Sequence, residues 1–123
     1  MIIEAQQPEG IALRLSEDEI DHWNSALNEV CHGFRVANFQ AATGIPESRA
    51  IRLLERIHAL VPGQPEVFEQ DEVLAVRNAL TTVLAELDAQ EYHTRIGFAV
   101  EDSRQMRNTL DALTGQMRLV KTA

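Results

Sequence analysis

The two halves of this chain align with each other at a fixed offset of 53 residues. Over residues 16–44 and 69–97, six of 29 positions are identical: Asp18/Asp71, Glu19/Glu72, Ala26/Ala79, Leu27/Leu80, Val30/Val83 and Gly44/Gly97. Phe39 and Tyr92 also align, outside the long apolar stretches. Self-similarity at a fixed period marks a repeated supersecondary unit. We therefore expect two copies of one folded unit.

Each copy has the pattern of a long helix, a short helix, a glycine and a second long helix. The first long helix starts at a capping box, Ser16 to Glu19, in which each side chain satisfies a free backbone N–H. Its apolar residues then fall on one stripe, at Ile20, Trp23, Leu27, Val30, Cys31 and Phe34. Gly44 and Gly97 follow the short helices, where a positive φ is common and glycine adopts it freely. Since one apolar face cannot be buried alone, we expect the copies to pack about a pseudo-two-fold axis.

Residues 1–15 have the pattern of a β-hairpin. Ile11, Leu13 and Leu15 alternate with less apolar residues, and the turn spans Gln7 to Gly10. A two-stranded hairpin is marginally stable in water, so this one must lie on the helices or pair with another chain. The sequence thus predicts a mainly α fold with one domain over 1–123. Its parts are the hairpin (1–15), helical repeat 1 (16–62, with its last helix running to about Val61), a proline-containing loop, and helical repeat 2 (68–120).

The composition excludes several classes of protein. The 123 residues carry 11 Lys and Arg against 19 Asp and Glu, a net charge of −8, which repels polyanions. Nucleic acid is therefore not the partner we expect. One cysteine rules out an intramolecular disulfide and a Cys-rich zinc site. No leader pattern or long apolar run is visible, so we expect a cytoplasmic location and no membrane.

Residues 39–54 resemble a helix-turn-helix. The matching features are the turn residue Gly44, the apolar Ile45 after it, and Ala50 and Leu53 in the next helix. The match departs from the motif at Gln40, where a small residue is usual. The resemblance implies a DNA-associated transcriptional regulator, which is our alternative function. Arg49, Arg52 and Arg56 share one helix face and would supply the contacts to DNA, although glutamates are interspersed among them.

A Glu-x-x-His pattern occurs three times, at Glu19/His22, Glu29/His32 and Glu55/His58. The pattern resembles the ligand motif of ferritin-like di-iron bundles, whose ligands point inward. With about 100° of rotation per residue, His22, Glu29 and His32 point away from the predicted apolar stripe. We therefore expect these side chains in solvent, with no metal or other cofactor. Cys31 and His32 also diverge, which disfavours nucleophilic catalysis.

No phosphate-binding loop or nucleophile elbow is present. We therefore expect a small, acidic, non-catalytic protein that acts through protein–protein interaction, of the inhibitor or toxin-neutralising immunity type. Its partner is a protein of unknown identity. The candidate contact residues are Arg49, Arg52, Arg56, His93 and Arg95. Because a hairpin offers free strand edges, we also expect a homodimer.

Overall fold

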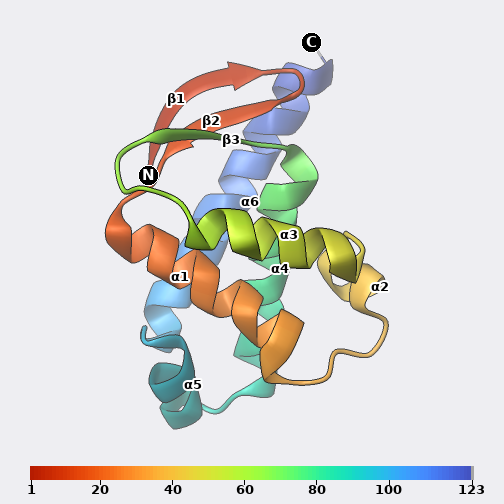
Figure 1. Ribbon diagram of the computed structural model, residues 1–123, viewed down its shortest axis with the longest axis vertical. Coiled ribbons are helices and arrows are strands. Elements are labelled where there is room, and N and C mark those ends of the chain that lie inside the picture. Colours follow the sequence, from red (N-terminus) through yellow and green to blue (C-terminus); the bar gives the residue numbers. More distant parts are fainter. Residues whose placement is uncertain (123) are drawn as a thin grey trace.

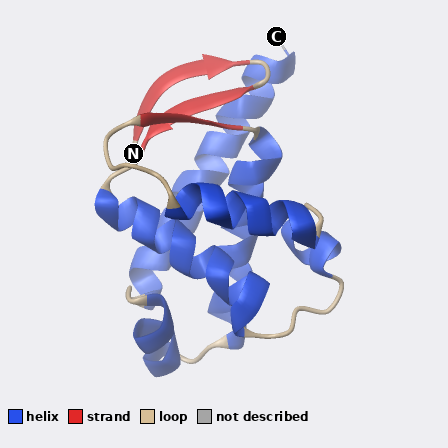
Figure 2. Cartoon of the chain, viewed as in Figure 1, coloured by secondary structure: helices blue, strands red, loops and turns tan. Residues whose placement is uncertain are grey.

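The computed structural model describes residues 1–122, with side chains as far as Arg118. In chain order the elements are β1 (Ile2–Gln7), β2 (Gly10–Arg14), α1 (Glu17–Asn28), the π-helical turn η1 (Glu29–Gly33), α2 (Phe39–Thr43), α3 (Glu47–His58), β3 (Pro65–Phe68), α4 (Gln70–Glu86), α5 (Ala89–Ile96) and α6 (Val100–Thr122). Helices make up most of the molecule, and a small sheet lies across one end of them (Figures 1 and 2). The predicted mainly α class and the N-terminal hairpin are both confirmed.

The predicted capping box starts α1. Ser16 Oγ accepts a hydrogen bond from the Glu19 backbone N–H at 3.2 Å, and Glu19 Oε1 accepts one from the Ser16 N–H at 2.9 Å. Two backbone donors that a helix start leaves without partners are thereby satisfied. The boundary between hairpin and helix is therefore determined by four adjacent residues.

The hairpin belongs to a three-stranded antiparallel sheet with the order β1-β2-β3. The prediction of a loop between the helical segments is wrong at Pro65–Phe68, which form β3. Pro65 is tolerated because it is the first residue of an edge strand, where its missing N–H breaks no ladder bond. The strand is short, and it forms because β2 is available to pair with it. It places Phe68 beside Ile11 in the register.

The inner face of the sheet packs on the helices. Ile11, Leu13 and Phe68 are fully buried there, and Phe68 meets the ring of Trp23 edge-on at 5.3 Å between centroids. Beneath them α4 is buried on more than one side, because it packs against α1, α2 and α6. Leu27 of α1 and Leu80 of α4 are fully buried in this same core.

Several element boundaries recur at a spacing of 53 residues. The pairs of helix starts are Glu17/Gln70 and Glu47/Val100, and the ends of the short helices are Thr43 and Ile96. Each short helix packs on the first long helix of the other half, α2 on α4 and α5 on α1. The glycines that follow the short helices have φ values of 91° (Gly44) and 84° (Gly97). The predicted left-handed conformation of both glycines is confirmed.

The end of α3 differs from its prediction. The helix ends at His58 rather than near Val61, and the Val61 side chain is 52% exposed. The residue before a proline disfavours helical backbone, so Pro62 ends the helix early despite the apolar Leu60 and Val61. Within the described part of the chain, no helix combines the length and the apolar character needed to cross a membrane.

Candidate functional site

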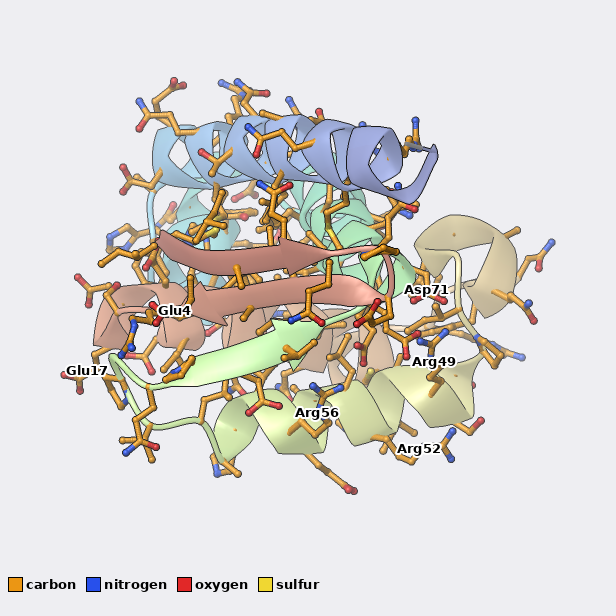
Figure 3. All side chains as sticks on the ribbon, turned by 90° about the horizontal axis from the view of Figure 1, so that it is seen from above. Glu4, Glu17, Arg49, Arg52, Arg56 and Asp71 are labelled. Atoms are coloured by element: carbon orange, nitrogen blue, oxygen red, sulfur yellow. The ribbon has the colours of Figure 1, made fainter. Side chains whose placement is uncertain are left out.

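Arg49, on the first turns of α3, is held by acidic residues at the start of α4. Its Nη2 donates to Glu69 Oε2 at 2.8 Å and to Asp71 Oδ1 at 2.9 Å, and its Nη1 is bound to the other oxygen of Asp71. Figure 3 shows Arg49 and Asp71 beside each other. The hydrogen bond to Asp71 raises the pKa of Arg49 above its ordinary value. Arg49 therefore joins α3 to α4.

Arg56 makes a second connection two turns further along α3. Its Nη1 donates to Glu72 Oε2 at 2.6 Å, and its Nη2 donates to Glu66 Oε1 at 3.0 Å and to the carbonyl of Val67 at 2.9 Å. The guanidinium also lies over the Phe68 ring, 5.5 Å from the centroid. The Glu72 side chain is only 8% exposed, so Arg56 supplies the partner that a buried carboxylate requires.

Arg52 lies between these two arginines in the sequence but is differently placed. It is exposed and, within the described residues, makes no ion pair. In Figure 3 it lies on the side of α3 away from the sheet. Of the three α3 arginines, Arg52 has its hydrogen-bond donors available to another molecule.

His93 and Arg95 lie on α5, at the opposite end of the molecule from the sheet (Figure 1). His93 is exposed. Arg95 donates from Nη2 to a Glu29 carboxylate oxygen and to the Gly33 carbonyl, the latter at 3.3 Å. Its guanidinium also faces the Phe34 ring at 5.9 Å. The five candidate contact residues therefore lie in two separate groups, and three of them hold elements of the fold together.

The expectation that His22 lies in solvent is wrong. Its side chain is 3% exposed, its Nε2 lies 2.6 Å from Ser103 Oγ, and its ring stacks on Phe98 at 4.2 Å between centroids. Burial lowers the pKa of His22, and the nearby Asp102 carboxylate partly opposes this effect. The prediction assumed that α1 has one buried face, whereas α1 packs against α3, α4 and α5 and is buried on several sides.

Glu29 is also buried, at 8% exposure, and its expected place in solvent is wrong for the same reason. Arg95 from α5 pairs with it. By contrast His32, His58 and Glu55 are exposed. Across residues 1–122 no three His, Cys, Asp or Glu side chains cluster closely enough to hold a metal ion.

Cys31 lies in η1 and is half-buried. Burial, together with the Glu47 carboxylate, raises the pKa of its thiol to about 11. At neutral pH the side chain is therefore a thiol rather than the reactive thiolate. This protonation state agrees with the interpretation of Cys31 as a small apolar residue.

Among the described residues, no helix covers the face of the sheet that is turned away from the helical core. This outer sheet face consists of Ile2, Ala5, Ala12, Arg14, Pro65 and Val67, which the strand register places side by side. Ile2 is 62% exposed and Val67 is 50% exposed, although both are large and apolar. Arg14 Nε donates to Glu4 Oε2 at 2.7 Å, and this ion pair places one positive and one negative charge on the outer sheet face. In Figure 3, seen from above, no described helix covers these strands.

The sequence predicts the hairpin but not this face, because Val67 and Pro65 belong to the unpredicted strand β3. The sequence signal for β3 is its period of two, in which Glu66 and Phe68 point to one face and Pro65 and Val67 to the other. Comparisons of the chain with protein-family models, with curated proteins and with solved structures give no match.

Proposed function

We propose that this is a non-catalytic protein that acts by binding other proteins, and that its first partner is a second copy of itself. The observation that carries the proposal is the outer sheet face, where Ile2 and Val67 are exposed and no described helix covers the strands. Exposed apolar side chains gathered on one face are typical of interaction surfaces in soluble proteins. A small acidic binder of the inhibitor or immunity type fits this size and charge.

The outer sheet face has the features that a two-fold contact requires. A surface that meets its own copy must complement itself, and Glu4 and Arg14 offer both charge signs on the same patch. Ala5 and Ala12 are small enough for two sheets to approach closely, while Ile2 and Val67 supply the apolar contact. Arg52 and His93, whose polar groups are exposed, remain candidates for contacts to a further protein.

Sedimentation velocity on two matched variants tests this proposal. Val67→Glu places a charge on the outer sheet face, whereas Val61→Glu places one on an equally exposed valine outside the sheet. We expect Val67→Glu to weaken self-association and Val61→Glu to leave it unchanged. Circular dichroism of both variants checks that they fold. If both folded variants self-associated to the same extent, the outer sheet face would not be the contact surface.

We also propose that the fold consists of two copies of one unit related by a pseudo-two-fold axis. The 53-residue spacing of the helix starts supports this, as does the reciprocal packing of each short helix on the other half. The antiparallel pairing of β2 with β3 is compatible with such an axis. In the alignment of the two halves, His22 of the first half corresponds to Ala75 of the second. The two halves therefore need not share a function.

The alternative function is that of a helix-turn-helix DNA-associated regulator. The observation in its favour is the succession of α2, the left-handed Gly44 and α3. The acidic partners of Arg49 and Arg56 weigh against it, because these guanidinium groups would have to leave carboxylates to reach phosphates. An electrophoretic shift with mixed genomic DNA at about 50 mM salt is the test, since non-specific binding is strongest at low salt. Absence of a shift removes the alternative.

A further inference from the structure

A groove runs between α1 and α3, which pack side by side below the sheet in Figure 1. It consists of two adjoining hollows of about 300 and 420 Å³, and both are lined by Asn24 and His58. One wall is a single face of α1, along which Glu17, Asp21, Asn24 and Asn28 recur every three or four residues. The turn η1 extends this wall to His32, so that it is roughly 22 Å long at the usual helical rise.

The walls of this α1–α3 groove carry hydrogen-bond acceptors that the fold does not use. The carboxylates of Glu17, Asp21 and Glu55 line it, and none of them has an ion-pair partner among the described residues. These acceptors favour an occupant with many N–H donors and positive charge.

Beside these polar side chains, the lining includes aliphatic ones. Ile20 and Leu54 reach the groove from the edge of the core, each 8% exposed, and the half-buried Leu60 lies near one end. Aliphatic side chains beside carboxylates match a helix that is apolar on one side and basic on its flanks. Its length of about four helical turns matches such a ligand better than a single side chain or a small molecule.

We propose that the α1–α3 groove binds a basic amphipathic helix of a partner protein. The apolar side of that helix would lie on Ile20 and Leu54, and its lysines or arginines would face Glu17, Asp21 and Glu55. A second copy of this chain is a poorer occupant, since its own net charge of −8 opposes its approach to an acidic groove. The inference goes beyond the proposed function, because this groove and the outer sheet face are different surfaces.

The probe is a synthetic amphipathic helix of leucine and lysine, titrated into isotope-labelled full-length protein at about pH 8, above the ordinary titration range of histidine. A helix of leucine and glutamate with the same pattern is the matched anionic probe. We expect saturable amide shifts confined to α1, η1 and α3 with the first probe and none with the second. Shifts centred on the outer sheet face, or equal binding of both probes, would overturn the proposal.

A pair of double variants separates groove binding from general attraction to an acidic protein. Asp21→Asn with Glu55→Gln removes two groove carboxylates, and we expect about a tenfold loss of affinity for the leucine–lysine helix. Glu86→Gln with Glu91→Gln removes the same charge from exposed positions on α4 and α5 and is expected to change affinity by less than about twofold. Equal losses would show that overall charge alone attracts the probe. Val67→Glu should leave binding of the leucine–lysine helix intact. A lack of self-association and a lack of helix binding in the groove can therefore be distinguished.

Discussion

The imidazole of His22 and the hydroxyl of Ser103 lie 2.6 Å apart, and this buried hydrogen bond joins α1 to the first turn of α6 across 81 residues of sequence. The ring of Phe98 stacks on the imidazole of His22. Tyr92, on the neighbouring helix α5, is fully buried. The contact fastens the second half of the chain to the first helix. It also makes the stability of the fold depend on the charge of one ring.

His22 makes stability decrease with acidification. Burial lowers its pKa in the folded state, whereas the unfolded chain has the ordinary histidine pKa of about 6.5. Protonation therefore favours unfolding, so the contribution of His22 is full above that pH and is lost as the pH falls below it. Urea unfolding across this range should show a weaker dependence in His22→Gln than in the wild type. The matched variant His58→Gln, at an exposed histidine, should keep the wild-type dependence; identical curves for both variants would contradict this assignment.

Arg95 supplies the partner of the buried Glu29 carboxylate. Arg95→Met leaves that carboxylate without its cation, so we expect the free energy of unfolding to fall by about 1–3 kcal/mol. Arg104→Met is the control, because the one ion pair of Arg104 among the described residues is an exposed pair with Glu101 at 3.7 Å. Its loss should change stability by less than about 0.5 kcal/mol. Chemical denaturation measures both. If Arg95→Met left the free energy of unfolding unchanged, Glu29 would not need this partner.

Gly97→Ala tests the left-handed helix end. With φ at 84°, an added Cβ is strained whatever space surrounds it, and we expect a loss of about 1 kcal/mol or more. Gly44→Ala, at φ 91°, should behave alike. Gly115→Ala is the opposite case, since Gly115 lies within α6 with open space around it and alanine should stabilise that helix by about 0.5–1 kcal/mol. Thermal unfolding measures the three stability changes. If all three had the same sign, the left-handed conformation would not be what distinguishes Gly44 and Gly97 from Gly115.

Leu27→Ala and Leu80→Ala test whether the two halves contribute alike to the core. Both side chains are fully buried, so each truncation should cost roughly 2–5 kcal/mol through lost contacts and the cavity left behind. Equilibrium denaturation in urea gives both values. A large difference between them would argue against equivalent roles for the two leucines.

The features that the sequence predicted correctly are those decided by neighbouring residues. Ser16 and Glu19 cap each other within one turn, and Gly44 and Gly97 each follow a short helix directly. The hairpin likewise depends on local alternation and a proline–glycine turn. In all these cases the physical cause lies within a few positions of its effect.

The features that were missed depend on partners far away in the chain. β3 is too short and too rich in proline to be predicted without β2 beside it. His22 and Glu29 were predicted in solvent because a single stripe was counted, and only Ser103 and Arg95, more than 60 residues away, make their burial tolerable. The same holds for Arg49 and Arg56, whose acidic partners lie beyond α3.

The proposed function depends first on association of this protein with a second copy through the outer sheet face. Light scattering across a dilution series measures the mass of the unmodified protein in solution most directly. We expect twice the chain mass of 13.8 kDa at the higher concentrations, decreasing towards the mass of one chain on dilution. A mass of 13.8 kDa at every concentration would contradict it.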